Sequence, residues 1–202
     1  MIEKIMFQLN PESTFFFIRH GTTEANLQKL WCGGDWDIDL HEDGRRQAEK
    51  LSDRILDISS EFDHIYSSPM LRARQTMRLI NLKAGKPSKV LEGLREWRIG
   101  VLEKQPWTDP LLGKPITSWP MPEGGESTEI FSERIASALR YCMQKSERPL
   151  IVSHGAVGRI VLDILKIPDQ HIPNCRLFKF KSTIEGGKVL WTVTDYSVPV
   201  KS

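Results

Sequence analysis

Five residues with charged or reactive side chains stand where apolar runs give way to polar turns: Arg19, His20, Arg72, Glu96 and His154. Two guanidinium groups offer forked N–H donors that match phosphate oxygens. A neutral imidazole can attack phosphorus and form a covalent intermediate. One carboxylate can protonate the leaving oxygen and then deprotonate water, provided that its pKa is raised. The set predicts a pocket for a phosphate-like dianion, and it leaves open which imidazole attacks.

The same residues argue against a metal centre. One carboxylate is too few for a binuclear cage, and no HxxxH spacing is present for zinc. Cys32, Cys142 and Cys175 lie far apart and form no CxxC pair. We therefore expect no metal, no other cofactor and reduced thiols. Cys32 follows the first histidine closely, so a reactive thiol is one interpretation and a passive small residue the simpler one.

The elements expected around these residues alternate between strands and helices. Phe15 to Ile18 form an uninterrupted apolar run, which predicts a strand buried on both faces and ending at Arg19. Further strands are expected over 62–66, 89–94 and 150–152. Helices with apolar residues at three- and four-residue steps are expected to begin near Glu42, after Ser67-Ser68-Pro69, after Ser127 and after Gly155.

This order of elements predicts a three-layer α/β/α sandwich with a mostly parallel sheet. Alternating residues over 178–193, with a Gly-Gly turn between them, predict a hairpin at the sheet edge. The C-terminal ends of parallel strands share one edge, where ligands bind in such folds. The charged residues at the strand ends should therefore converge. We expect one of Arg72, Arg74 and Arg78 to face that edge.

Residues 101–125 contain five prolines together with Trp107 and Trp119. A loop of this length is usually either functional or disordered, and two tryptophans argue against disorder. We expect an ordered, lid-like insert over the site, within a single domain spanning 1–202. Residues 1–14 are a lead-in with a short edge strand near Ile5, and 195–202 a loose end.

Composition excludes several classes of partner. The 202 residues are 40% hydrophobic, carry a formal charge of +2 and contain no basic block that suggests nucleic acid. No stretch approaches the ~20 apolar residues of a membrane span, and the first residues do not resemble a signal peptide. We expect a cytoplasmic protein that binds a small molecule, neither nucleic acid nor membrane, with a homodimer through the edge hairpin as one arrangement.

Four segments resemble the motifs of the histidine phosphatase superfamily, the phosphoglycerate-mutase-like proteins. Arg19-His20-Gly21-Thr22-Thr23-Glu24-Ala25-Asn26 resembles the RHGxTxxN signature. Residues 67–76, Leu94-Arg95-Glu96 and Val152-Ser153-His154-Gly155 are similar to the later motifs, in the family's order, so the likeness spans 14–157. RHG alone would be a weak signal, whereas four motifs in register are a strong one.

The resemblance implies a phosphoglycerate mutase-like fold and a phosphoric monoester hydrolase that needs no metal. His20 would be the phosphorylated nucleophile and Glu96 the proton donor, while Arg19, Arg72 and His154 would hold the phosphoryl group. The carbonyl of Gly21 would hold the His20 ring in its neutral form. The residues implied to contact substrate are Asn26, Thr23, Cys32, Gly33 and Ala156.

Three departures from the family favour a phosphatase over a mutase. Ala25 stands where mutases commonly carry Trp, Thr22 replaces an acidic or amide residue, and the insert before Glu123 is short. A phosphoglycerate mutase remains the alternative, and a non-catalytic phospholigand-binding protein a second one. The presence of His20, Glu96 and His154 together argues against a non-catalytic binding protein. The substrate class, a small phosphorylated metabolite, includes sugar phosphates, phosphoglycerates, phosphoserine and α-ribazole phosphate.

Overall fold

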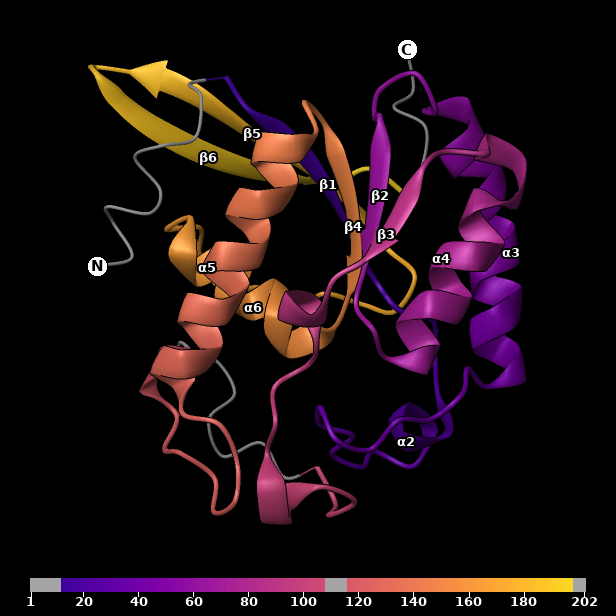
Figure 1. Cartoon of the computed structure of the whole chain (residues 1–202), viewed down its shortest axis with the longest axis vertical. Coiled ribbons are helices and arrows are strands. Elements are labelled where there is room, and N and C mark those ends of the chain that lie inside the picture. The colour runs from indigo at the N-terminus through magenta and orange to yellow at the C-terminus, as the bar shows by residue number, and fades with distance from the viewer. Residues whose placement is uncertain (1–11, 108–115, 198–202) are drawn as a thin grey trace.

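The computed structural model describes residues 12–107 and 116–197 (Figure 1). A six-stranded sheet runs through it in the order β3-β2-β4-β1-β5-β6. The strands are β1 (Thr14–Arg19), β2 (His64–Ser67), β3 (Ser88–Val90), β4 (Pro149–Ser153), β5 (Leu177–Glu185) and β6 (Lys188–Asp195). β1 to β4 pair in parallel, and β5 joins β1 antiparallel, which makes β5–β6 the expected edge hairpin.

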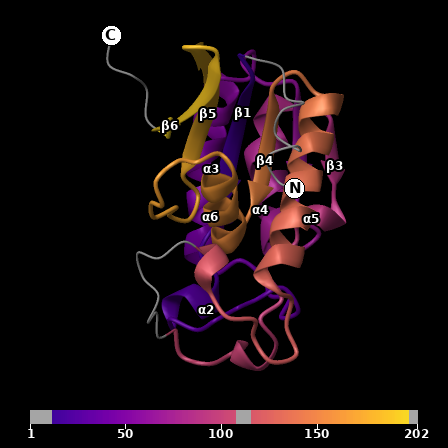
Figure 2. The same ribbon diagram turned by 90° about the vertical axis from the view of Figure 1, so that its left-hand side faces the viewer.

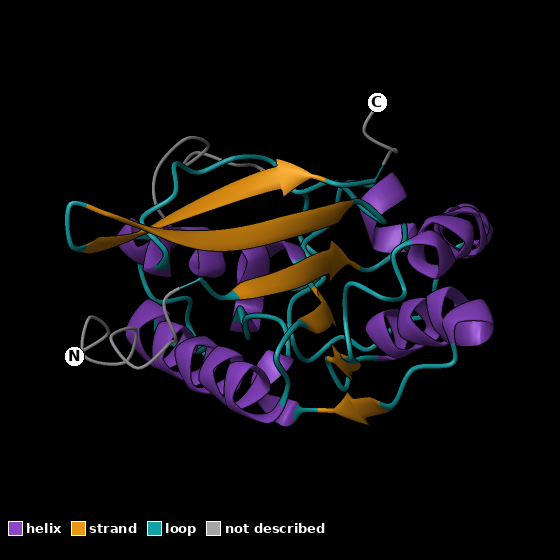
Figure 3. Cartoon of the chain, turned by 90° about the horizontal axis from the view of Figure 1, so that it is seen from above, coloured by secondary structure: helices purple, strands orange, loops and turns teal. Residues whose placement is uncertain are grey.

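Helices cover both faces of this sheet. They are α2 (Glu24–Leu27), α3 (Glu42–Asp57), α4 (Leu71–Ala84), α5 (Thr128–Lys145) and α6 (Gly155–Ile164), with 3-10 turns at Glu92–Leu94, Gly100–Leu102 and Ile116–Ser118. α3 and α4 pack on one face and α5 and α6 on the other (Figure 1). Figure 2 shows α5 and α6 in front of the sheet, and Figure 3 shows the strands between the two sets of helices. The predicted α/β/α sandwich is confirmed.

The central strand β1 fixes the register of the whole fold. Phe15 and Phe17 face α5 and α6, Phe16 and Ile18 face α3 and α4, and all four side chains are fully buried. Phe15 also stacks on Phe180 of β5 with 4.6 Å between ring centroids. A slip of one residue would exchange these two faces. Because burial of each such side chain is worth about 1.5–3 kcal/mol, the polar residues after β1 are held at one position on the sheet edge.

Two glycines bring α3 against the loop that follows β1. A Cβ atom on Gly21 would lie 2.5 Å from the carbonyl oxygen of Gly44, and one on Gly44 would lie 2.1 Å from that of Thr22. Real side chains do not fit at such distances, so the two backbones touch directly. The first turn of α3 therefore supports the loop that carries His20.

Some boundaries differ from the expectation. α4 begins at Leu71, because Ser68 accepts the Met70 N–H at 3.2 Å before the helix starts. The expected strand over 89–94 is extended only as far as Val90 and then turns into a 3-10 helix. The expected loose end is wrong for Tyr196, whose hydroxyl donates to Glu61. The expected edge strand near Ile5 and the middle of the insert, 108–115, lie outside the described residues.

Candidate active site

A cavity of about 710 Å³ lies where β1 and its parallel neighbours end. In Figure 1 these strands end towards the bottom of the picture, and α2 and the segment after β3 lie below them. Its lining contains most of the predicted site residues: Arg19, His20, Asn26, Cys32, Gly33, Arg72, Glu96 and Ala156. Thr23 and His154 do not line it. Strand-end convergence therefore places the predicted chemistry in one cavity.

His20 is held as a neutral ring with one free nitrogen. Its Nδ1 donates to the Gly21 carbonyl at 2.7 Å, and its backbone N–H donates to Ser153 of β4 at 2.9 Å. Burial, followed by the charges of Arg72 and Arg19, holds the pKa of His20 well below its usual value. Since Nδ1 carries the proton, Nε2 keeps its lone pair and is the nitrogen available for attack.

Arg72 is buried and Arg19 is half-buried, and backbone carbonyls anchor both. Arg19 Nη1 donates to Ile172 at 3.0 Å, and burial lowers the pKa of Arg19. Arg72 is 1% exposed and donates from Nη2 to Gly33 at 2.8 Å and from Nη1 to Trp36 at 3.1 Å. Each Nε is buried with no hydrogen-bond partner among the described residues. Each guanidinium group therefore keeps an N–H donor for a ligand.

Only one arginine of α4 reaches the site. Arg72 lies inside the protein, whereas Arg74 and Arg78 are exposed on the opposite side of the helix. Of the three arginines considered from the sequence, the structure places Arg72 at the cavity.

His154 lies directly beside His20. The two ring centroids are 5.2 Å apart, and His154 is fully buried at the start of α6. Its Nε2 lies 2.6 Å from the hydroxyl of Ser68, which already accepts the Met70 N–H. If that hydroxyl donates to Nε2, the proton of His154 is on Nδ1, a buried atom without a partner in the described structure. His154 is then a donor held beside the nucleophile.

The burial of these two imidazoles predicts a pH dependence of stability. The pKa of His154 is lowered by burial and by Arg72, His20 and Arg19, in the same direction as that of His20. The unfolded chain therefore binds more protons below about pH 6.5, so stability is complete above that pH and lost as pH falls. Urea unfolding at pH 7.5 and pH 5 should show a lower free energy of unfolding at pH 5.

Glu61 and Asp63 have lowered pKa values, so their contributions to the free energy of unfolding are lost only at still lower pH. The change between pH 7.5 and pH 5 is therefore assigned to the two histidines. The variant His154→Gln should show a smaller difference between the two pH values than the unmodified chain. His41→Asn, on the surface, is the control. Equal stability at both pH values would contradict the buried neutral imidazoles.

Glu96 is fixed by two backbone donors. Oε1 accepts from its neighbour Trp97 at 2.9 Å, and Oε2 accepts from Ala156 in the first turn of α6 at 3.2 Å. Arg134 of α5 donates to the carbonyls of Gly93 at 3.1 Å and Arg95 at 2.8 Å. The half-buried carboxylate thus reaches the cavity from a segment tied to both α5 and α6.

Thr23 has a different place from the expected one. It is fully buried, caps α2, and its backbone N–H donates to Asn26 Oδ1 at 3.1 Å. Its side chain therefore orients Asn26 instead of lining the cavity. The sequence reasoning missed Asn174, whose amide donates to the carbonyl of His20 at 2.8 Å and to Asn26 at 3.3 Å. The only signal for Asn174 was its position in the loop before the strand that pairs with β1.

Cys32 lines the cavity as a protonated thiol. Its Sγ lies 3.5 Å from the Trp36 carbonyl, and burial raises its pKa to about 11. Since the thiolate is the reactive form, the passive interpretation fits this environment.

The insert contributes a wall of the cavity. Trp107, Ile116 and Trp119 line it. Further lining residues were not singled out from the sequence, among them Lys29, Trp31, Arg159 and the loop from Asp169 to Asn174. That loop has no motif of its own, and its position follows only from the pairing of β5 with β1.

Glu103 stabilises the turn at residues 33–36, and this turn anchors Arg72. Its Oε1 accepts from the backbone N–H groups of Asp35 at 2.9 Å and Trp36 at 3.3 Å. The carbonyls of Gly33 and Trp36 in this turn accept from Arg72. Glu103→Ala should therefore raise KM for phosphate esters by up to about 10- to 150-fold, which corresponds to ~1.5–3 kcal/mol for hydrogen bonds to a charged group.

Steady-state kinetics of the Glu103 variants measure this effect. Glu103→Gln retains an acceptor oxygen and should recover most of the lost affinity. An unchanged KM in Glu103→Ala would show that the turn holds Arg72 without the carboxylate.

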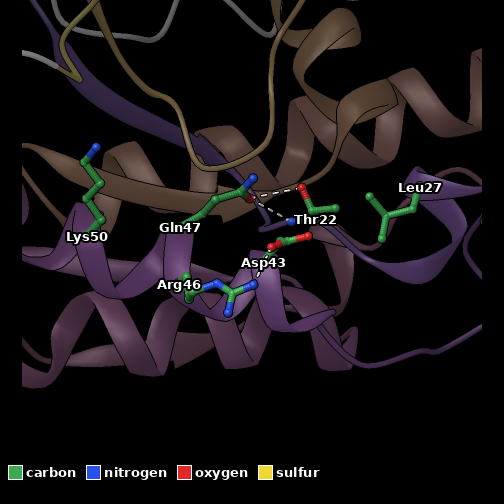
Figure 4. A pocket seen from close by; sticks show the side chains of 6 residues that line it. All are labelled: Thr22, Leu27, Asp43, Arg46, Gln47 and Lys50. Carbon is green, nitrogen blue, oxygen red and sulfur yellow. Dashed lines mark hydrogen bonds and ion pairs between the residues drawn. The ribbon is translucent and has the colours of Figure 1, made fainter.

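A second hollow of about 370 Å³ lies beside the same loop, between Thr22, Leu27 and α3 (Figure 4). Gln47 accepts there from the backbone and hydroxyl of Thr22 at 3.0 and 3.1 Å, and Arg46 pairs with Asp43 at 2.7 Å. Its polar groups mostly bind one another. The group of unengaged donors lies in the larger cavity.

Within 12–107 and 116–197, no three His, Cys, Asp or Glu side chains are grouped as metal ligands would be. In the same part of the chain, no helix combines the length and apolar character needed to cross a membrane.

Comparison with known proteins adds to this geometry. The family model of the histidine phosphatase superfamily (branch 1) matches residues 15–191. The uncharacterized phosphatase PhoE of Bacillus subtilis is 30% identical over 184 residues, covering 90% of this chain and 92% of that protein. The probable phosphoglycerate mutase GpmB of Escherichia coli K12 is 30% identical over 201 residues, covering 91% and 89%.

Solved structures support the fold. The α-ribazole phosphatase of Shigella flexneri superposes with a TM-score of 0.73 at 23% identity, over 94% of this chain and 100% of that one. A mycobacterial glucosyl-3-phosphoglycerate phosphatase, in complex with VO3, gives 0.74 at 20% identity, over 90% and 97%. At these identities the likeness shows the architecture alone.

Proposed function

We propose that this chain, which belongs to the histidine phosphatase superfamily, hydrolyses small phosphate monoesters through a phosphohistidine on His20, without a metal or other cofactor. One observation carries the proposal. His20 keeps a free Nε2 in a cavity that Arg19, Arg72 and Glu96 also line. A neutral nucleophile, two cations and an acid–base group are the parts that metal-free phosphoryl transfer requires.

The first step is attack on the ester. His20 Nε2 forms a bond to phosphorus while the bond from phosphorus to the ester oxygen breaks, and Glu96 in its acid form gives that oxygen a proton. Arg19 and Arg72 bind the phosphoryl oxygens with the donors that the carbonyl contacts leave free. His154 does not line the cavity but lies beside His20, with 5.2 Å between the ring centroids, and its proposed role is to hold the same group once the substrate is bound. These donors thereby stabilise the charge on the transferring phosphoryl group.

The second step releases phosphate. Glu96, now a carboxylate, takes a proton from water as that water attacks phosphorus, and the bond from phosphorus to His20 breaks. The contact with Gly21 holds the ring in place through both steps. Asn26, Cys32, Gly33 and Ala156 line the cavity where the remainder of the substrate would lie.

A phosphoenzyme trap tests the mechanism. The protein is mixed with a 32P-labelled monoester and denatured in alkali, where phosphohistidine is stable. We expect label on His20, which acid then removes, and turnover that is insensitive to EDTA. Loss of all activity to EDTA would instead favour a metal enzyme, and binding of the ester without label or turnover would favour the non-catalytic phospholigand-binding alternative.

A phosphoglycerate mutase is the second candidate, favoured by the 30% identity to proteins that carry that name. A mutase must return the phosphoryl group to its substrate before water takes it. With 3-phosphoglycerate, a phosphatase releases free phosphate and a mutase forms 2-phosphoglycerate. We expect free phosphate.

We propose a single domain over 1–202, with the insert 101–125 as one wall of the site, and a small phosphorylated metabolite as the partner. The cytoplasm is the proposed location, supported by the three unpaired cysteines. β6 ends the described sheet and offers an edge to a second copy. Light scattering of the purified protein measures whether a homodimer forms.

A further inference from the structure

Part of the cavity lining is aromatic and has no role in the phosphoryl-transfer steps. Trp31, Trp107 and Trp119 line the same cavity as Arg19 and His20, together with Ile116 and Ile172. The cavity of about 710 Å³ lies within the ~300–1,000 Å³ range of sites that enclose whole small molecules. A phosphoryl group alone does not fill it. The aromatic residues are therefore placed to meet the rest of the substrate.

The indole rings stand edge to face. Trp31 lies 6.1 Å from Trp107 at 81° and 5.7 Å from Trp119 at 89°, measured between ring centroids and ring planes. Tilted pairs of this kind match the positive edge of one ring to the negative face of the next. Trp107 lines the cavity and is 46% exposed, so neighbouring residues do not cover it completely. A further planar ring can continue the same pattern there.

Some polar groups around the indoles bind one another, whereas the side chains of Lys29, Gln170 and His171 also line the cavity. Arg159 lies 5.1 Å above the Trp119 ring and forms an ion pair with Asp169 at 2.8 Å. Asn174 binds the carbonyl of His20. Trp119 Nε1, by contrast, is buried without a hydrogen-bond acceptor among the described residues. A buried indole N–H favours an acceptor such as a ring nitrogen or a carbonyl oxygen.

We propose that the substrates are phosphate monoesters whose ester group carries an aromatic or heteroaromatic ring, and that this ring binds against Trp31, Trp107 and Trp119. The binding of the phosphate group in this inference rests on the proposed function. The binding of the aromatic ring rests on the indole geometry and the unpaired Trp119 N–H.

Two esters with matched leaving groups test the ring. 2-Phenylethyl phosphate and 2-cyclohexylethyl phosphate both release a primary alcohol and have similar size, so they differ in the π face. Stacked or edge-to-face rings gain ~0.5–1.5 kcal/mol beyond burial, or about 2- to 12-fold in affinity. We expect kcat/KM for the phenyl ester to be higher by that factor, chiefly through a lower KM.

Variants locate the effect. In Trp107→Leu the ratio of the two esters should fall towards one, because the exposed ring is lost while the arginines and His20 remain. Trp191→Leu, on β6 and outside the cavity lining, removes an indole without touching the site and should keep the ratio. A ratio of one in the unmodified chain, or a ratio unchanged by Trp107→Leu, overturns the proposal. So does a tenfold higher kcat/KM for glucose 6-phosphate or 3-phosphoglycerate.

Binding separates this inference from the proposed function. The His20→Ala protein lacks the nucleophile but keeps the indoles, so calorimetry gives the affinity of both esters without turnover. Tighter binding of the phenyl ester, with no turnover in the unmodified chain, would retain the ring site and reject the hydrolase. Equal binding together with His20-dependent turnover would reject the ring site and retain the hydrolase.

Discussion

Replacement of His20 by alanine is expected to abolish phosphate release from 4-nitrophenyl phosphate, with a loss in kcat of at least about 10⁴-fold. The variant removes the nitrogen that bonds to phosphorus, and the other groups of the site cannot substitute for it. Loss of the attacking residue in other covalent enzymes costs roughly 10⁶-fold in kcat. The arginines and Glu96 can still bind and polarise the ester, so substrate binding should persist while turnover is lost.

The control for this variant is His41→Asn. His41 caps α3 through its side chain, and asparagine can serve the same cap, so activity should not change. A label on the phosphoenzyme should be absent from His20→Ala and present in the control. If His20→Ala retained full turnover, His20 would not be the nucleophile. Label appearing on His154 would identify that residue instead.

Arg72→Lys is expected to lower kcat/KM for phosphate esters by roughly 10²–10³-fold, the usual cost of one lost donor to a developing charge. Lysine keeps the positive charge but has no planar fork. It cannot satisfy the carbonyls of Gly33 and Trp36 and still present a donor to the ligand. The inhibition constant of inorganic phosphate should rise in parallel, because the same donors bind the product.

α4 supplies the matched control. Arg74 lies two residues further along the helix and is exposed, so Arg74→Lys should leave both constants unchanged. Thermal unfolding of the two variants separates loss of function from loss of fold. If Arg72→Lys retained both constants in a folded protein, the charge alone would be sufficient, and the anchoring carbonyls would have no catalytic consequence.

The sequence could predict the site because parallel strands share one edge. Once Phe15 to Ile18 were identified as a buried strand, Arg19 and His20 had to lie at its end. The same reasoning placed His154 after β4. Both outcomes depend on hydrophobic pattern and strand direction, which the sequence carries locally.

Other features depend on contacts that no local pattern encodes. Asn174 binds the His20 carbonyl across a sequence separation of 154 residues. Ser68 belongs to a segment that suggested a helix cap, and its hydroxyl binds both His154 and the backbone before α4. Thr23 matched a motif position, yet its burial beneath Asn26 follows from the short helix α2. Tertiary packing decided these three residues.

The position of β1 in the sheet also determines when the protein can become active during its synthesis. Both neighbours of β1, β4 and β5, lie in the C-terminal part of the chain. During synthesis, the four apolar residues of β1 are therefore made well before the two strands that pair with them. Long-range pairing of this kind slows folding, and bare strand edges favour aggregation until it is complete. The helical pair α3–α4 can form early, but the nucleophile is aligned only when the last strands add to the sheet.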